Sequence, residues 1–271
     1  MKLSFTTLGC PEWTLEQIAT NARSNGYDGV ELRTHADGNH LSPDASPDEA
    51  RRVADLFRAH GVPVMSVMGY TKFAFLDPAE VQRNQELMRK LIAIAAAMGA
   101  RYIRTFAGKL PDGTTHAQMI DVVADALRPL AREAATKGVT IGMETHDDWC
   151  ASHVSLQLVE KIRSRKGFGI IYDVCNCLYA GIEPWRTTYR KLKPHILYCH
   201  VKDGWRDAAG TFQYAALGAG DQPWREVLQA LKKDRFKGFL SFEWERKWHP
   251  ELEPPERVFP QYVHKVRSLW G

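Results

Sequence analysis

Four residues of the sequence have side chains of the types that bind divalent cations: Glu144, Asp173, His200 and Glu243. Each stands at the end of a short apolar run that is rich in strand-forming residues. Three carboxylates and one imidazole suit a hard or borderline cation and leave positions open for two substrate oxygens. The sequence therefore predicts one divalent metal ion, with Mn²⁺ as the first candidate and Mg²⁺, Co²⁺ or Zn²⁺ as alternatives.

The four side chains share a direction if their runs are parallel strands. Alternate side chains of a strand point to opposite faces. Where the apolar Ile141 and Met143 face covering helices, Glu144 faces the interior, and the same alternation holds for the other three runs. Taken singly, each residue could be a capped loop residue or the partner of another side chain in an ion pair. Together, uncompensated carboxylates gathered at the same end of the parallel strands would repel each other, and a bound metal cation would remove that cost.

Elements that could position these residues alternate regularly along the chain. Helical periodicity separates eight apolar runs, so the pattern predicts a parallel sheet covered by helices. The expected strands are Leu3 to Thr7, Gly29 to Arg33, Val62 to Val67, Tyr102 to Phe106, Val139 to Glu144, Gly169 to Asp173, Ile196 to Val201 and Phe239 to Glu243. The expected helices are Leu15 to Ser24, Pro47 to Ala59, Pro78 to Met98, Ala117 to Lys137, Leu156 to Ser164 and Trp224 to Lys233.

Glycines mark the joints between these elements. Six of them stand between a helical pattern and a strand, where a left-handed cap would end the helix: Gly26, Gly61, Gly99, Gly138, Gly167 and Gly238.

The repeating unit predicts an α/β fold, a single (β/α)8 TIM barrel that forms one domain over residues 1–271. An open doubly wound sheet would need a glycine fingerprint after the first strand, and Leu8-Gly9-Cys10-Pro11 is not one. The proline-rich stretch from Pro250 to Pro260, with Gln261 to Trp270 after it, is expected to be a C-terminal tail packed on the barrel.

Composition indicates a soluble cytoplasmic protein. The formal net charge is +4, but the 36 Lys and Arg residues are scattered among 32 acidic ones, so nucleic acid is not suggested as a partner. No apolar stretch is long enough to span a membrane. The five cysteines are an odd number without a paired metal-binding motif, which is typical of reduced thiols.

The chain resembles the xylose-isomerase-like TIM barrel superfamily, especially its sugar (phosphate) isomerases and epimerases of the tagatose-3-epimerase type. The resemblance spans essentially the whole chain. The residues that carry it are Glu144-Thr145-His146, Asp173 with Asn176, His200-Val201-Lys202-Asp203, Leu217-Gly218-Ala219-Gly220-Asp221 and Glu243.

This resemblance implies an enzyme that moves a proton next to a carbonyl through an enediolate. Glu144 and Glu243 would bind the metal and also act as acid and base on opposite faces of a sugar, and Asp173 and His200 would complete the ligand set. Arg206, which follows the histidine by six residues, would contact substrate oxygens. Members of the family often form dimers or tetramers, so a homo-oligomer is possible.

One position departs from the epimerase pattern, because Asn176 stands where a histidine is usual. An amide can donate a hydrogen bond but cannot shuttle a proton. The departure keeps open a second reaction, in which a metal-dependent dehydratase of an inosose-like polyol ketone expels hydroxide from the same enolate.

Other candidate substrate-binding residues follow from position. His146 stands two residues beyond Glu144. Lys202 is either a group that orients the site or a surface ion-pair partner. If side chains alternate along the second strand, Glu31 and Arg33 both point into the interior, where buried charges need each other or a ligand.

Two further classes of function are disfavoured. An abasic-site nuclease of the same superfamily needs histidines that Val67-Met68-Gly69 and Phe106-Ala107-Gly108 lack. A binding protein without catalysis would not need the complete set of four ligands. The substrate is expected to be a small sugar or polyol, and a free one is preferred to a phosphorylated one because no glycine-rich phosphate loop is evident.

Overall fold

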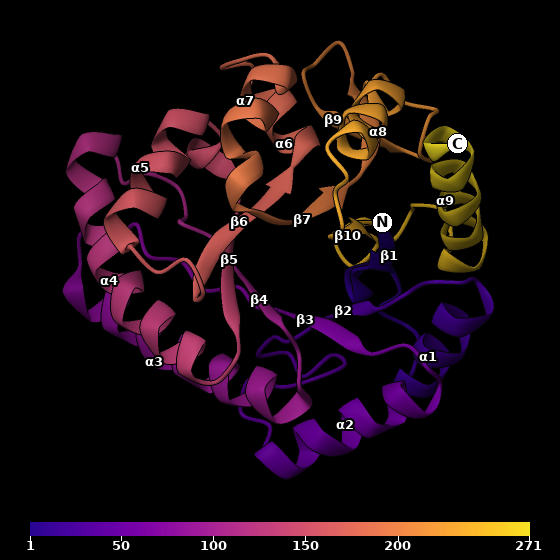
Figure 1. Ribbon diagram of the computed structural model, residues 1–271, viewed down its shortest axis with the longest axis horizontal. Helices are drawn as coiled ribbons and strands as arrows, with labels where there is room; N and C mark the ends of the chain where they lie inside the picture. Colours follow the sequence, from indigo (N-terminus) through magenta and orange to yellow (C-terminus); the bar gives the residue numbers. More distant parts are fainter.

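The computed structural model describes residues 1–271 and contains an eight-stranded parallel sheet that curls into a nearly closed barrel (Figure 1). The strand order is β1, β10, β7, β6, β5, β4, β3, β2. The two ends of the sheet meet at a bridge between Thr6 and Glu31. The barrel strands are β1 (Lys2–Phe5), β2 (Val30–Arg33), β3 (Val64–Met68), β4 (Tyr102–Thr105), β5 (Thr140–Glu144), β6 (Phe168–Asp173), β7 (Ile196–Val201) and β10 (Phe239–Phe242).

Helices surround the barrel, as Figure 1 shows, and this arrangement confirms the predicted TIM barrel. Each of the six predicted helices is present: four have the predicted bounds, and only the fourth and fifth differ, by one to four residues at their ends. The observed helices are α1 (Leu15–Ser24), α2 (Pro47–Ala59), α3 (Pro78–Met98), α4 (His116–Thr136), α5 (Ser152–Ile162), α6 (Val174–Ala180), α7 (Trp185–Leu192), α8 (Trp224–Lys233) and α9 (Pro255–Trp270).

Three features were not predicted. After β6 the chain forms two short helices, α6 and α7, and after β7 it forms an antiparallel hairpin of β8 (Asp203–Arg206) and β9 (Phe212–Ala215). The expected C-terminal tail is largely a regular helix, α9. Pro255 is compatible with this helix because it is in the first turn, where a missing N–H costs nothing. Phe259 and Tyr262 of α9 pack on Phe5 and Phe242, which anchors the helix to the barrel.

Two hydrophobic cores result from the alternation of side chains along the strands. The larger core lies between the sheet and the helices, and it includes Ile141, Met143 and Tyr172. The smaller one consists of four residues inside the barrel, Met65, Tyr102, Ile171 and Tyr198. The structure thus confirms that Ile171 faces inward while Tyr172 faces the helices. We refer to the four interior residues as the barrel floor.

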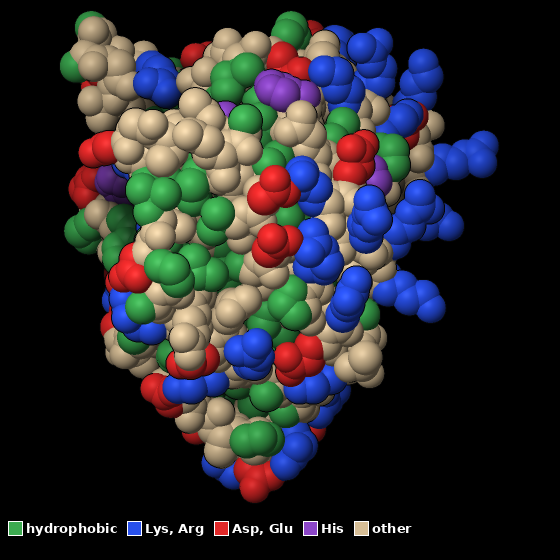
Figure 2. All heavy atoms as spheres, turned by 90° about the vertical axis from the view of Figure 1, so that its left-hand side faces the viewer, with side chains coloured by type: hydrophobic (Ala, Val, Ile, Leu, Met, Phe, Trp, Pro, Cys, Tyr) green, Lys and Arg blue, Asp and Glu red, His purple; other side chains and the backbone are tan.

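The surface mixes both charges. Figure 2 shows the face formed by α3, α4 and α5, where Asp and Glu side chains are interleaved with Lys and Arg, which are more frequent along the right-hand edge. Ion pairs link neighbouring helices on this face, as between Arg89 and Glu133 and between Lys161 and Asp121. None of the helices is long and apolar enough to cross a membrane.

The glycine joints are of two kinds. Gly26, Gly61, Gly99 and Gly138 have φ values of 78°, 71°, 71° and 73°, so these four left-handed caps are confirmed. The prediction was wrong for Gly167 and Gly238, because the left-handed residues near those helix ends are Arg163 (φ 53°) and Arg235 (φ 56°). Gly167 is needed for another reason: a Cβ there would lie 1.8 Å from the carbonyl oxygen of Ala131.

We expect Gly167→Ala to destabilise the protein more than Gly138→Ala does. At Gly138 nothing lies within 4 Å of an added Cβ, so the cost is that of the left-handed backbone, about 1 kcal/mol. At Gly167 the backbone of β6 or α4 has to move, which costs about 1–3 kcal/mol or more. Urea unfolding of both variants measures the difference, and equal free energies of unfolding would contradict the packing argument.

Candidate metal centre

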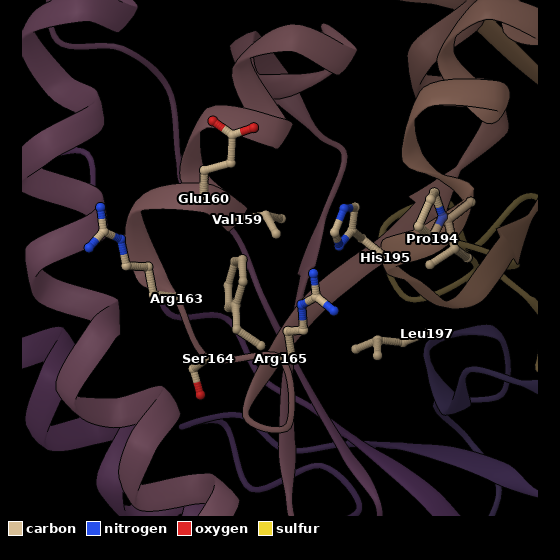
Figure 3. Close-up of a pocket in the computed structure, with 10 residues that line it drawn as sticks. Val159, Glu160, Arg163, Ser164, Arg165, Pro194, His195 and Leu197 are labelled. Atoms are coloured by element: carbon tan, nitrogen blue, oxygen red, sulfur yellow. The ribbon is translucent and has the colours of Figure 1, made fainter.

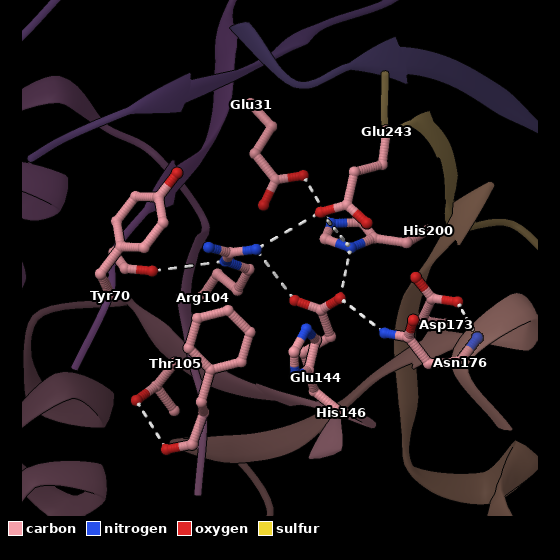
Figure 4. Close-up of polar contacts among 12 residues, drawn as sticks. Glu31, Tyr70, Arg104, Thr105, Glu144, His146, Asp173, Asn176, His200 and Glu243 are labelled. Atoms are coloured by element: carbon pink, nitrogen blue, oxygen red, sulfur yellow. Dashed lines mark hydrogen bonds and ion pairs between the residues drawn. The ribbon is translucent and has the colours of Figure 1, made fainter. Parts of the chain in front are cut away.

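The four predicted ligands meet at one end of the barrel. Glu144, Asp173 and His200 lie at or near the C-terminal ends of β5, β6 and β7, and Glu243 directly follows β10. One ligand atom from each lies within 4.8 Å of the others, and all four residues are buried (Figure 4). This buried cluster of three carboxylates and one imidazole suits a divalent cation. We call these residues the four-ligand cluster.

His200 is held by carboxylates on both ring nitrogens. Its Nδ1 lies 3.1 Å from Glu144 Oε1, and its Nε2 lies 3.0 Å from Glu31 Oε2. The Glu31 carboxylate also accepts hydrogen bonds from Tyr198 Oη (2.6 Å) and Ser241 Oγ (3.0 Å). Histidines that bind metals commonly pair their second nitrogen with a carboxylate in this way. Glu31, predicted to bind substrate, therefore lies beside His200 with its oxygens already filled, where it can fix the orientation of the ring.

We expect Glu31→Gln to weaken binding of a divalent cation by about 10–100-fold, because the imidazole loses its anionic partner. Titration calorimetry of the metal-free protein with Mn²⁺ measures the change. The control is Glu12→Gln, which replaces an exposed carboxylate paired with Arg246. An unchanged affinity in Glu31→Gln would show that Glu31 does not position a ligand.

Asp173 presents one unfilled oxygen to the cluster. Its Oδ1 caps α6 by accepting a hydrogen bond from the Asn176 backbone N–H (2.7 Å). Its Oδ2 is buried without a hydrogen bond, although Lys202 Nζ lies 3.1 Å away. Burial raises the pKa of Asp173 to about 6, against the opposing effect of Lys202. An acceptor oriented by a helix cap and left unfilled is well suited to ligate a cation.

Lys202 lies inside the site and not at the surface. Its Nζ lies 2.9 Å from Glu243 Oε2 and 3.3 Å from Glu245 Oε1, in addition to its contact with Asp173. Lys202 therefore does not form the surface ion pair that the sequence left open, and its role in orienting the site or binding substrate stays a prediction. The adjacent Asp203 turns away and accepts hydrogen bonds from backbone N–H groups, among them that of Gly218 (2.6 Å).

Arg104 is the residue of this site that the sequence analysis missed. It lies on β4, is 2% exposed, and donates from Nη1 to Glu144 Oε2 (3.0 Å) and Glu243 Oε1 (3.4 Å). Alternation could have found it, because Ile103 belongs to the outer core and Tyr102 to the barrel floor, which sends Arg104 inward.

The positively charged side chains of Lys202 and Arg104 alter the charge balance that the sequence alone suggested. Lys202 and Arg104 compensate part of the carboxylate charge, so the acids are not wholly unpaired without a metal. Five carboxylates, counting Glu31 and Glu245, surround these two permanent cations and His200. Negative charge therefore remains that a divalent cation would reduce.

Two of the other predicted substrate-binding residues, Asn176 and His146, lie at or near the four-ligand cluster. Asn176 donates from Nδ2 to the carbonyl oxygen of Thr145 (3.2 Å) and lies 3.5 Å from Glu144 Oε1, so it contacts the four-ligand cluster. His146 stands at the mouth, with Nδ1 3.0 Å from Asp147 Oδ2 and its ring against Phe106. Both placements are compatible with the predicted contacts, which remain predictions.

Arg33 and Arg206 are held by other partners. Arg33 is buried and forms a two-pronged pair with Asp37, at 2.7 and 3.0 Å. Arg206 lies on the exposed hairpin, where it donates to the carbonyl oxygens of Gly210 and Tyr179. The structure thus does not bring Arg206 to the cluster, because the unpredicted hairpin carries its guanidinium to other acceptors.

A large cavity lies at the opposite end of the strands from the four-ligand cluster. It has a volume of about 840 Å³ and is lined by the end of α5 and by the N-terminal ends of β6 and β7, including Arg165, His195 and Leu197 (Figure 3). Because the four-ligand cluster lies at the C-terminal strand ends, this cavity is not part of it.

Comparisons with known proteins agree with the fold. Residues 19–264 match the family model described as xylose isomerase-like TIM barrel. No curated protein matches the chain by sequence. Three similar solved structures are an L-ribulose 3-epimerase (TM-score 0.82, 17% identity, covering 99% of this chain and 94% of that one), the probable 3-DHS dehydratase AsbF from Bacillus anthracis (0.80, 18%, 98% and 99%) and the IOLI protein with a bound zinc atom (0.81, 18%, 100% and 98%).

The identities to these structures are low, so the structural likeness establishes the fold alone. The family match covers most of the chain, from α1 to α9. The chain therefore belongs to the xylose isomerase-like TIM barrel family.

Proposed function

We propose that this protein is a divalent-metal-dependent enzyme that moves a proton at the carbon next to a carbonyl in a small sugar or polyol. The observation that carries the proposal is the buried four-ligand cluster, whose ligand atoms lie within 4.8 Å of one another. Structural neighbours with epimerase and dehydratase names, and one with zinc, support the same class of chemistry.

The residues that would hold the metal are Glu144, Asp173, His200 and Glu243. When bound, the cation would act as a Lewis acid that polarises the substrate carbonyl and makes the neighbouring C–H more acidic. Mn²⁺ is our first candidate from the donor set, and Zn²⁺ is the alternative with a precedent among the neighbours.

Glu144 and Glu243 would transfer the proton. Burial raises the pKa of the Glu144 carboxyl, but His200 and Arg104 outweigh this and hold it below its ordinary value. Lys202 does the same for Glu243. Both groups are therefore carboxylates near neutral pH, and either can accept the proton that leaves carbon.

The first candidate reaction is isomerisation or epimerisation, in which the second glutamate returns a proton to the enediolate. The second candidate is dehydration, and Lys202 is the observation that favours it. Its ammonium group lies 2.9 Å from Glu243 and can donate a proton to a departing hydroxyl, whereas Asn176 cannot shuttle protons.

An exchange experiment separates these reactions. The Mn²⁺-loaded protein is incubated in D₂O with ketoses and with cyclic polyol ketones and followed by proton NMR. Deuterium at the carbon next to the carbonyl, with a new epimer or aldose, supports the first candidate. Loss of water with a new C=C signal supports the second. Absence of both metal binding and exchange would contradict the proposal.

We expect metal affinity to rise with pH. Asp173, with a pKa of about 6, must be deprotonated to bind. Burial lowers the pKa of His200, but Glu243 and Glu144 raise it well above its usual range in the metal-free protein, so binding must also release that proton. Below pH 6 the apparent affinity should fall by about tenfold or more per pH unit. Calorimetry with Mn²⁺ from pH 5 to 8 measures it, and a flat profile would contradict these protonation states.

A further inference from the structure

Arg104 has partners on one side of its guanidinium and none on the other. Nε donates to the carbonyl oxygen of Gly69 (3.3 Å), and Nη1 donates to Glu144 and Glu243. Nη2 is buried and has no hydrogen-bond partner. In Figure 4 the unbonded nitrogen lies on the side of Tyr70, away from the carboxylates. Because a guanidinium carries five N–H groups, the two on Nη2 remain free.

The guanidinium cannot turn to find another acceptor. Its central carbon lies 4.8 Å from the ring centre of Tyr70 and 4.3 Å from that of Phe106, and the contacts of Nε and Nη1 fix its plane. Buried charged donors in native proteins are almost always paired. An unpaired one, held rigidly beside candidate acid and base groups, indicates that a ligand supplies the acceptor.

The charges near Tyr70 favour an anion as that ligand. The Arg33 guanidinium also lies over the Tyr70 ring, at 5.3 Å. Arg33 and Lys247 share the single carboxylate of Asp37, at 2.7 and 3.5 Å. Arg33 and Lys247 together carry one positive charge more than Asp37 neutralises, and arginine donors bind carboxylates especially well.

We propose that the substrate carries a carboxylate that accepts a hydrogen bond from Arg104 Nη2 while its carbonyl end lies at the four-ligand cluster. This inference rests on the proposed function and narrows the substrate class from neutral sugars to polyhydroxylated keto acids. Arg104 binds the two glutamates and the carboxylate through one rigid group, so it sets the distance between the anionic end of the substrate and the carbon that reacts.

Two matched probes test the proposal by binding alone. D-gluconate and D-glucitol share a six-carbon polyhydroxy chain and differ in having a carboxylate or a hydroxymethyl group at one end. Calorimetry with the Mn²⁺-loaded protein should show that gluconate binds about tenfold tighter or more. Arg104→Lys keeps a cation near Glu144 and Glu243 but lacks Nη2. The ratio of the affinities for gluconate and glucitol should therefore fall towards one. The control, Arg101→Lys at an exposed position just before β4, should keep it.

The outcomes separate this inference from the metal proposal. Equal affinities for the two probes in the wild type, or an undiminished preference in Arg104→Lys, would overturn the role of Arg104, and the wild-type comparison decides even if the variant does not fold. Mn²⁺ binding is measured first, without either probe. If Mn²⁺ does not bind, the proposed metal centre fails, and the same probes measured on the metal-free protein still decide whether Arg104 selects the carboxylate.

Discussion

Glu243→Gln is expected to reduce proton exchange at carbon by about 10²–10⁴-fold, the usual contribution of a positioned acid or base. The amide is nearly the same size as the carboxylate, but it has one acceptor oxygen where Arg104 and Lys202 each faced one, and the group can no longer take a proton. It is also a weaker metal ligand. The rate is measured by deuterium incorporation at a Mn²⁺ concentration that saturates the variant, which separates lost chemistry from lost metal.

The control for this prediction is Glu245→Gln. Glu245 contacts Lys202 at 3.3 Å but is not one of the four ligands, so its variant should change exchange far less. Equal losses in the two variants would show that removing negative charge near Lys202, and not a proton-transfer group, causes the effect. Unimpaired exchange in Glu243→Gln would assign the acid and base roles elsewhere.

Lys202→Met should have the largest effect on stability. The variant removes the cation between Asp173 and Glu243, so the buried Asp173 carboxylate loses its ion-pair partner and Glu243 keeps only Arg104 and His200. Removing one partner of a buried ion pair typically costs about 3–5 kcal/mol. Excess Mn²⁺ should restore part of this loss, because a bound cation supplies the missing positive charge. Urea unfolding with and without Mn²⁺ measures both quantities.

A matched surface substitution controls for the loss of a lysine. Lys191→Met removes a partly exposed partner of Glu183 and is expected to cost no more than about 1 kcal/mol, without any response to Mn²⁺. If Lys202→Met were as mild as Lys191→Met, the carboxylates of the cluster would have to be protonated or solvated in the metal-free protein.

The barrel and its four converging side chains could be predicted because both depend on short-range patterns. Strand alternation fixes the direction of Glu144 relative to Ile141 and Met143, and the repeat of strands and helices fixes which strand ends share a mouth. The prediction that the four residues bind a metal is untested by the structure, although the predicted meeting of their side chains is observed.

The other features of the site could not be predicted because they depend on contacts between segments far apart in the sequence. The partners of Lys202 lie on β6 and after β10, so its sequence neighbourhood could not distinguish a buried cation from a surface one. Glu31 and His200 are 169 residues apart in the sequence, and only the closed barrel makes them partners. Arg206 was placed by a motif, but a hairpin that the sequence did not reveal carries it elsewhere. The possible homo-oligomer remains a prediction.

The barrel floor has a kinetic consequence. Met65, Tyr102, Ile171 and Tyr198 fill the interior below the four-ligand cluster and are almost inaccessible to solvent. They fill the interior on that side, so a small molecule would reach the cluster from the C-terminal strand ends. Product has to leave by the path along which the next substrate arrives, so accumulated product should act as a competitive inhibitor, and the sealed end of the barrel makes turnover sensitive to how fast the mouth clears.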